Sequence, residues 1–317
     1  MRRRSLLAVF AVAVAAAPLH GHAFDPKVMD SVVSVIPLWP GHKRGGEAGT
    51  PPGSAPEGSG IAVLPSGLIA TSLHVVDRAT EITVRLRDGR QVPATLAAGD
   101  PPTDIALLRI TEDLPVLPVA PEPRLGAPVC AVGNQFGLDL SVTCGVVSAT
   151  RRSGTGFNPV EDFVQTDAVV NPGSSGGALV DADGRLVGML SAIFTKDSDA
   201  NIGVNFAVSA ALLMRVVGDL AEAGQVLRPR LGIRVSDLSA EEARREVGVR
   251  VIEVFPDSAA AAAGLQVGDY IVRVADREIR KAGGVTTAVQ LQRRGDRITI
   301  ELRRDGAAKT VEAVLGQ

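Results

Sequence analysis

The strongest constraint on the fold is a series of short apolar runs that turn signals separate from one another. Between residues 61 and 208 these runs read IAVL, LIATS, EITVRLR, QVPATL, DIALLRI, PVCAVG, SVTCGVVSA, DFVQT, LVGMLSA and VNFAV. Alternation of apolar and polar residues in short runs is typical of β-strands. The pairs Asp88-Gly89 and Asp183-Gly184 stand between such runs and supply the positive φ angles that tight hairpins need. Many strands without intervening helices predict closed barrels or a sandwich.

Three features divide the rest of the chain. The segment DSVVSVIPL indicates a strand or a short helix, and the polar Gly/Pro stretch after it predicts a mobile loop over residues 41–60. The segment SAALLMRVVGDLAEAG predicts a helix, with Ser209 as its N-cap and Gly224 at its end. We expect this helix to close a first domain over residues 24–224.

Residues 228–317 predict a second, small α+β domain of compact size. We expect strands at RLGIRV, VRVIEVF and YIVRVA, a capping box of Ser239 and Glu242, an Ala-rich turn, a short helix near 285–290 and a final hairpin around Asp305-Gly306.

The first residues, MRRRSLLAVFAVAVAAAPLHGHA, place three arginines before an apolar run that ends in small residues. This pattern predicts a signal peptide over residues 1–23, cleaved after Ala23, and hence an exported, periplasmic protein. An uncleaved membrane anchor is the alternative. Loss of the arginines takes the net charge from −2 to about −5, which makes nucleic acid a poor partner.

The chain has 317 residues and only two cysteines, Cys130 and Cys144. They flank a Gly-containing loop between two apolar runs, so a hairpin would place them roughly opposite each other. Export permits a disulfide there, and two buried thiols fit the sequence equally well.

A pair of serines in NPGSSGGALV, which starts at Asn171, raises the question of a nucleophile. A serine nucleophile needs a base, and a third group that orients the base. The mature chain offers His42, in the predicted mobile loop, and His74, at the end of a predicted strand. Asp104 enters the apolar run IALLRI directly, where a carboxylate needs a hydrogen-bond donor such as a histidine Nδ1–H.

The order of these residues distinguishes two hydrolase folds. GSSGG matches the G-x-S-x-G elbow of α/β-hydrolases, but that fold needs a histidine after the serine and none follows residue 74. The order His74, Asp104, Ser175 is that of chymotrypsin-like double barrels. We therefore predict Ser175 as nucleophile, with an oxyanion hole from the backbone N–H groups of Gly173 and Ser175 and with the Ser174 amide as a helper.

Motifs along nearly the whole mature chain resemble the HtrA (Deg) family of trypsin-like proteases. The segments that carry the resemblance are GSGIAVLPSGLIATSLHVV, PPTDIALLRI, AVGNQFGL, SVTCGVVSA, DFVQTDAVVNPGSSGGALV and GVNFAVSAALL. RPRLGIRV and VIEVFPDSAAAAAGLQVGDYIVRVADREI are similar to the PDZ domain of that family. The resemblance implies a mainly β fold, a chymotrypsin-like double β-barrel followed by a PDZ domain. It also implies ATP-independent endoproteolysis of unfolded polypeptides, homotrimeric assembly, and control by peptides that bind the PDZ domain.

Specificity follows from the residues around the nucleophile. Val169 and Val170 lie in the stretch that builds the S1 floor of trypsin-like folds, and they predict cleavage after small aliphatic residues. Asn205 replaces a glycine frequent in the family and adds a side chain beside the strand that should line S1. Asp167 is the nearest acid, and we expect it to accept loop N–H bonds instead of binding a basic P1 side chain.

The second domain predicts a peptide groove. Leu231, Gly232 and Ile233 can turn successive amides toward a peptide carboxylate, and the strand through Arg234 and Val235 offers an edge for β-augmentation. The helix around Val285 and Val289 would form the other wall. The alternative is an edge strand covered by its own domain.

Two other functions are alternatives to proteolysis, and the sequence argues against the second of them. A non-enzymatic holdase or scaffold would keep the barrels and the groove without turnover. A metal-dependent hydrolase lacks a ligand cluster, because the mature chain has two histidines, two dispersed cysteines and no HExxH motif. We therefore expect no metal and no other cofactor.

Overall fold

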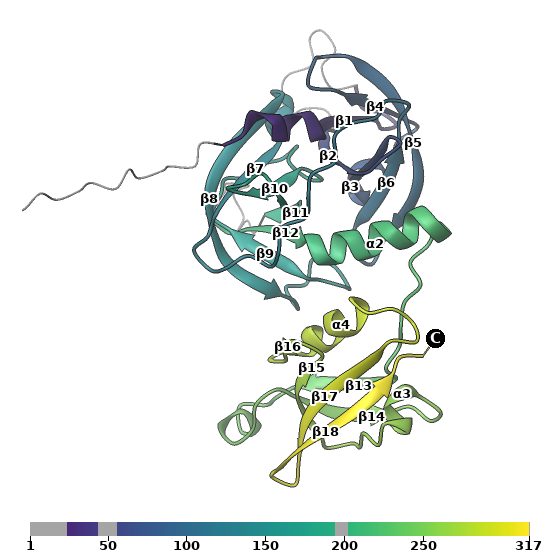
Figure 1. Ribbon diagram of the computed structural model, residues 1–317, viewed down its shortest axis with the longest axis vertical. Helices are drawn as coiled ribbons and strands as arrows, with labels where there is room; N and C mark the ends of the chain where they lie inside the picture. Colours follow the sequence, from purple (N-terminus) through teal and green to yellow (C-terminus); the bar gives the residue numbers. More distant parts are fainter. Residues whose placement is uncertain (1–23, 44–55, 194–201, 317) are drawn as a thin grey trace, which may run out of the picture.

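The computed structural model describes residues 24–43, 56–193 and 202–316 (Figure 1). The predicted signal peptide, residues 1–23, lies outside the described residues. In the described part of the chain, no helix is long and apolar enough to cross a membrane.

The first six strands form a closed barrel in the order β1-β2-β3-β6-β5-β4, with antiparallel neighbours. A 3-10 helix, η1 (Pro26–Ser31), leads into it, so the segment DSVVSVIPL contains both a short helix and a strand. The strands are β1 (Val32–Leu38), β2 (Gly58–Leu64), β3 (Leu68–Ser72), β4 (Glu81–Arg85), β5 (Gln91–Asp100) and β6 (Ile105–Arg109), and one turn of helix, α1 (Leu73–Val76), follows β3.

A second closed barrel contains the next six strands in the order β10-β11-β12-β9-β8-β7. Its strands are β7 (Pro128–Asn134), β8 (Leu140–Arg152), β9 (Phe163–Thr166), β10 (Ala178–Asp181), β11 (Leu186–Ile193) and β12 (Asn205–Ser209). The 3-10 turn η2 (Gln135–Gly137) joins β7 to β8 and forms the tip of a long hairpin. The fold is therefore the chymotrypsin-like double barrel.

One apolar core joins the two barrels. It unites residues of both barrels with the buried face of α2 (Ala210–Ala223), whose contributions include Leu213 and Val217. Ser209 caps this helix, because its hydroxyl accepts the Leu212 N–H at 3.1 Å, and Gly224 ends it at φ 69°. α2 lies between the barrels and the C-terminal domain (Figure 1).

The C-terminal PDZ domain is a sheet in the order β13-β14-β15-β17-β18, with β16 paired to β15. Its elements are β13 (Ile233–Asp237), η3 (Glu242–Arg244), β14 (Val249–Val254), α3 (Ala259–Ala262), β15 (Tyr270–Val274), β16 (Arg277–Glu278), α4 (Ala282–Gln290), β17 (Arg297–Arg304) and β18 (Ala307–Val314). The predicted capping box is present, because Ser239 and Glu242 each accept the other's backbone N–H.

The structure corrects three local expectations. Residues 58–60, which the predicted loop 41–60 included, begin strand β2 and are buried, while residues 44–55 lie outside the described part of the chain. The Ala-rich segment is a single helical turn, α3, with Ser258 as its cap. Strand β10 directly follows the glycines of GSSGG, and the sequence patterns did not predict a strand there.

Candidate active site

His74 and Asp104 meet at the end of the first barrel. His74 lies in α1, and its ring Nδ1 is 2.6 Å from Asp104 Oδ2. Since an ionised carboxylate only accepts, Nδ1–H is the donor and Nε2 is left to accept a proton. Asp104 Oδ1 also accepts the His74 backbone N–H at 2.9 Å, and the Asp104 carbonyl accepts the Leu73 N–H at 3.0 Å.

The end of β1 holds α1 from the other side. The Trp39 indole N–H donates to the Val75 carbonyl at 3.1 Å, and the Thr80 N–H donates to the Leu38 carbonyl at 2.9 Å. A one-turn helix leaves its last carbonyls without internal partners, so the indole satisfies one of them. The His74 side chain itself is half exposed, at 52%.

Burial distinguishes the two serines. Ser174 is fully buried, and its hydroxyl has no hydrogen-bond partner among the described residues. Ser175 is partly exposed, and its hydroxyl donates to the Ser191 carbonyl at 3.4 Å. Between Ser175 and His74, no hydrogen bond is present in this conformation of the described chain. Of the two hydroxyls, that of Ser175 is therefore the accessible one.

The backbone of the serine loop is held at almost every polar group. The Pro172 carbonyl accepts the Phe136 N–H at 2.7 Å, and the Ser174 carbonyl accepts the Gly177 N–H at 2.8 Å. In a trans peptide the N–H points opposite to the C=O, so these two bonds aim the Gly173 and Ser175 N–H groups the other way. Neither N–H donates to any residue that the structure describes. These are the two groups predicted for the oxyanion hole.

Two further details concern this loop. Gly173 has φ +92°, and a Cβ there would lie 2.1 Å from the Asn134 carbonyl oxygen, so only glycine fits. The Ser174 amide donates to the Asn171 carbonyl at 3.0 Å. It is therefore engaged in the turn, and its predicted role as a helping oxyanion donor is wrong for this conformation.

The predicted S1 residues separate in the structure. Val169 exposes 43% of its surface, whereas Val170 is buried in the core of the second barrel. Asn205 is fully buried and its amide donates to the Ala168 carbonyl at 2.9 Å. The side chains of Val170 and Asn205 are thus enclosed, and of the three predicted S1 residues only Val169 is exposed. Asp167 accepts the Val146 N–H at 2.7 Å, as expected of a loop residue.

In the PDZ domain β13 is an edge strand, paired with β14 alone among the described strands. Ile233 and Val235 pack against the domain core, which contains Val285 and Val289 of α4. The Arg234 side chain does not join this core and forms an ion pair with Glu253 at 2.8 Å. The opposite edge of β13 has no strand partner among the described residues, and α4 lies near it.

The turn before β13 is the loop for which the sequence predicts carboxylate binding. Gly232 has φ +81°, and a Cβ there would lie 2.2 Å from the Ser258 Cβ. The carbonyls of Leu231 and Gly232 accept the N–H groups of Ala260 and Phe255. Within the described residues the amides of Leu231 and Gly232 donate no hydrogen bond.

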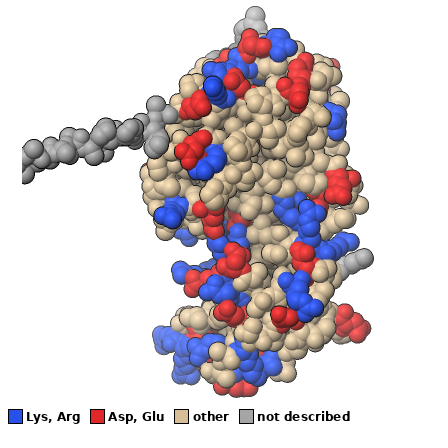
Figure 2. Space-filling model, in the orientation of Figure 1, with Lys and Arg blue, Asp and Glu red and all other residues tan. Residues whose placement is uncertain are grey.

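Ion pairs join the PDZ domain to the barrels, and oppositely charged side chains gather around this junction (Figure 2). Arg277 binds buried Asp162 through two nitrogens, one on each carboxylate oxygen, at 2.6 and 2.9 Å. One nitrogen of Arg228 donates to both carboxylate oxygens of Asp100, at 2.8 and 2.6 Å. The Thr287 hydroxyl of α4 donates to the Glu161 carbonyl. The PDZ domain is thus fixed on the face of the protease domain that carries α2.

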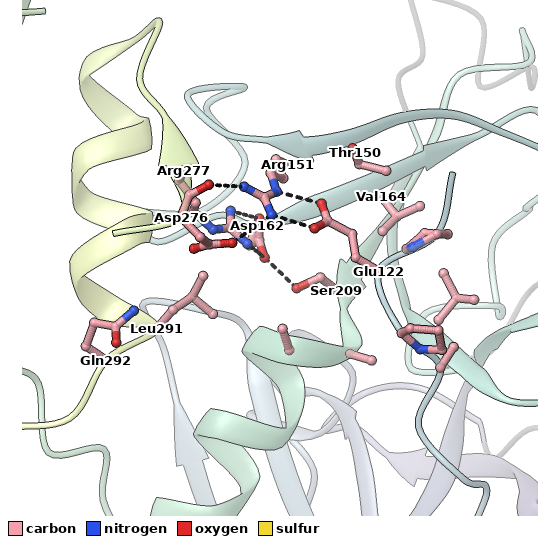
Figure 3. Close-up of a pocket in the computed structure, with 16 residues that line it drawn as sticks. Glu122, Thr150, Arg151, Asp162, Val164, Ser209, Asp276, Arg277, Leu291 and Gln292 are labelled. Carbon is pink, nitrogen blue, oxygen red and sulfur yellow. Dashed lines mark hydrogen bonds and ion pairs between the residues drawn. The ribbon is translucent and has the colours of Figure 1, made fainter. Parts of the chain in front are cut away.

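A cavity of about 280 Å³ lies at this junction, and none of the three predicted catalytic residues lines it. Figure 3 shows the residues around it. Arg151 bridges Glu122 of the protease domain and Asp276 of the PDZ domain there. The Arg151 guanidinium holds the pKa of Glu122 below its usual range, against the opposing effect of burial. Among the described residues, no cluster of three or more His, Cys, Asp or Glu side chains is arranged to hold a metal ion.

Cys130 and Cys144 are opposite each other in the β7–β8 hairpin and form a disulfide, with Cα atoms 4.0 Å apart. The structure thus selects the bridge over two separate thiols.

Sequence missed several residues that organise this site, among them Trp39 and Asn134. Trp39 is part of no motif that would have singled it out in the sequence. Asn134 is fully buried, and its amide donates to Glu57 at 2.7 Å while its side-chain oxygen accepts the Asp139 N–H. Ser59, whose hydroxyl accepts the Asn134 N–H, was missed as well. Its two neighbouring glycines were a usable signal, because glycine in a strand often marks the close approach of another backbone.

Comparisons with known proteins agree with both domains. Residues 58–189 match the family model of the trypsin-like peptidase domain, and residues 229–315 match that of the PDZ domain. The periplasmic serine endoproteases DegP of Salmonella typhimurium and of Escherichia coli are each 37% identical to the chain, over 89% and 86% of its length. The chain spans only about three fifths of the length of those relatives, 61% and 60%.

Solved structures match over almost their full length. The HtrA-type protease AlgW with a tripeptide superposes with a TM-score of 0.70 at 35% identity, covering 91% of this chain and 94% of that one. A serine endoprotease from Yersinia pestis superposes with a TM-score of 0.59 at 31% identity, covering 93% of this chain and 98% of that one.

Proposed function

Because this chain belongs to the HtrA family of trypsin-like serine proteases, we propose that it is a serine endopeptidase whose triad is His74, Asp104 and Ser175. The observation that carries the proposal is the pair of hydrogen bonds that Asp104 accepts from His74, one from the ring Nδ1–H and one from the backbone N–H. A carboxylate that holds Nδ1–H keeps the imidazole in the tautomer that can act as a general base.

The reaction proceeds by acyl transfer. Ser175 rotates away from the Ser191 carbonyl and gives its proton to His74 Nε2 as Oγ attacks the scissile carbonyl. The negative oxygen of the tetrahedral intermediate accepts the Gly173 and Ser175 N–H groups. His74 then protonates the leaving amine, and water repeats the sequence to release the acyl group.

The substrates are unfolded or misfolded exported polypeptides, which the protease cleaves after small aliphatic residues without ATP. Val169 supplies an exposed apolar side chain next to the nucleophile loop, and Asp167 is occupied by a backbone N–H. The protein acts in the periplasm after loss of residues 1–23, and it assembles as a homotrimer. C-terminal peptides add a strand to β13 and place their carboxylate on the Leu231 and Gly232 amides.

Casein digestion tests the proposal. The wild type should degrade casein without ATP, and Ser175→Ala should remove the activity while Ser174→Ala keeps it. Mass spectrometry of the products should give Val, Ala or Ile at P1. Equal digestion by wild type and Ser175→Ala would refute the nucleophile, and a dominant Arg or Lys at P1 would refute the specificity.

A catalytically silent, peptide-binding holdase is the second candidate, because the Ser175 hydroxyl donates to Ser191 and not to His74. A fluorophosphonate probe separates the two functions. A protease is labelled at Ser175, whereas a holdase suppresses aggregation of an unfolded protein without being labelled.

A further inference from the structure

We propose that Ser59 is a positioning residue of the oxyanion hole, an inference that rests on the protease activity proposed above. Ser59 lies at the start of β2 in the first barrel and is fully buried. The oxyanion loop follows β9 of the second barrel, more than a hundred residues later in the chain. Ser59 is thus the point where the first barrel contacts the loop that carries the nucleophile.

Three hydrogen bonds make this contact. The Ser59 N–H donates to the Ser175 carbonyl at 2.8 Å. The Ser59 hydroxyl donates to the Gly173 carbonyl at 2.8 Å and accepts the Asn134 N–H at 2.8 Å. One hydroxyl therefore satisfies two backbone groups, the partly buried Gly173 carbonyl in the loop and the buried Asn134 N–H at the end of β7.

The Ser59 hydroxyl holds one of the two peptide planes that meet at Gly173. The Gly173–Ser174 peptide is held at its carbonyl by Ser59 and at its N–H by the Asn171 carbonyl. The preceding peptide is held at the Pro172 carbonyl by the Phe136 N–H. Because Gly173 has no Cβ, its φ and ψ angles are otherwise soft, and the orientation of its N–H depends on these partners.

Removal of the hydroxyl affects both partners at once. The buried Asn134 N–H and the partly buried Gly173 carbonyl would each be left without this partner, which is costly. The loop relieves that cost by turning the Gly173–Ser174 peptide. This changes the ψ angle of Gly173 and the φ angle of Ser174, so the two flanking peptides shift and the Gly173 and Ser175 N–H groups no longer converge where the oxyanion forms. The hydroxyl contacts no substrate atom, so its effect on catalysis is indirect.

The chain offers a matched control in Ser34. It lies on β1 directly opposite Ser59 in the register and is also fully buried. Its hydroxyl has no hydrogen-bond partner among the described residues. Ser34→Ala is therefore the same chemical change, in the neighbouring strand, without the loss of a bond.

The experiment compares wild type, Ser59→Ala and Ser34→Ala on a fluorogenic peptide substrate, with melting curves for all three. A peptide aldehyde, whose hemiacetal oxygen needs the oxyanion hole, and the non-covalent product peptide serve as two inhibitors. We expect Ser59→Ala to lower kcat about tenfold or more and to weaken the aldehyde by a similar factor. KM and the affinity of the product peptide should change less than about twofold, and Ser34→Ala should match the wild type.

Two results would overturn the inference: an unchanged kcat in Ser59→Ala, or parallel losses of aldehyde and product-peptide binding, which indicate general structural damage. If Ser59→Ala does not fold, Ser59→Cys takes its place, because the thiol keeps roughly the same volume and is a weaker hydrogen-bond donor. A wild-type kcat in Ser59→Cys would also overturn the inference. A wild type that neither hydrolyses peptides nor reacts with a fluorophosphonate would instead refute the proposed function.

Discussion

Asp104 contacts His74 through both of its carboxylate oxygens, one on the ring Nδ1 at 2.6 Å and one on the backbone N–H at 2.9 Å. The carboxylate therefore fixes the ring and the first turn of α1 together. Asp104 has φ +56°, a conformation that aspartate and asparagine tolerate better than other residues with a Cβ.

Asp104→Asn should lower kcat by about three to four orders of magnitude with little change in KM, because the amide favours the wrong imidazole tautomer. Asparagine suits the positive φ, so the melting temperature should stay close to that of the wild type. Steady-state kinetics beside a melting curve checks this. Asp77→Asn, an equal charge change at the exposed end of α1, is the control and should retain activity. Full activity in Asp104→Asn would remove Asp104 from the triad.

Gly232→Ala should weaken the binding of C-terminal peptides about tenfold or more. A Cβ at this positive φ would overlap Ser258, so the loop has to move its amides away from the carboxylate. Fluorescence anisotropy of a labelled peptide, measured on the full chain with Ser175→Ala, tests this. Gly264→Ala is matched, since it has φ +78° and open space around it, and should bind normally. Equal affinity for free-carboxylate and amidated peptides would refute capture of the terminus.

Arg277→Ala should destabilise the docking of the PDZ domain by about 3–5 kcal/mol, because it leaves Asp162 buried without its charged partner. Small-angle scattering should show a larger radius of gyration, and limited proteolysis should cut residues 224–232. The exposed pair Arg234–Glu253 is the control, and Arg234→Ala should change stability by less than about 1 kcal/mol. Identical scattering curves for wild type and Arg277→Ala would contradict the prediction.

Glu161 makes stability depend on pH. Burial alone would raise the pKa of Glu161, but the N–H groups of Asn158 and Thr155 donate to its carboxylate and bring the pKa below its usual range. A lowered pKa in the folded state contributes stability above the unfolded pKa, about 4.5, and the contribution is lost as the pH falls through the folded value.

Glu161→Gln should therefore be less stable than the wild type by about 1–3 kcal/mol at pH 7, with a gap that narrows below pH 4. Urea unfolding at several pH values measures the gap. Glu222→Gln, at an exposed position near the end of α2, should show no gap at any pH. A gap that is independent of pH would mean that the charge of Glu161 is unimportant.

Reduction of the Cys130–Cys144 disulfide should lower the free energy of unfolding by about 2–4 kcal/mol, since it frees a loop of the unfolded chain. A reducing agent should therefore lower the melting temperature of the wild type. It should have no effect on a variant with both cysteines changed to alanine. The same response in both proteins would show that the bridge does not form.

The period of the apolar residues was enough to predict an all-β architecture in outline, and Ser209, Gly224 and the Asp-Gly pairs marked elements that the structure contains. Chain order alone separated two hydrolase folds. These features are local, since alternation, capping and turn chemistry depend on neighbouring residues. The sequence also singled out His74 and Asp104, which the fold brings within 2.6 Å of each other.

Only the tertiary structure decided which backbone groups around Ser175 are left free and which side chains are enclosed. Ser59 looked like part of a mobile loop, Val170 like a pocket residue and the Ser174 amide like an oxyanion donor. Two of them were reassigned by partners distant in sequence, Gly173 for Ser59 and the barrel core for Val170. Ser174 was reassigned by a local turn, in which its amide donates to the Asn171 carbonyl. Hydrogen bonds between segments depend on how two barrels pack, and that packing is a property of the whole chain, not of any local pattern of residues.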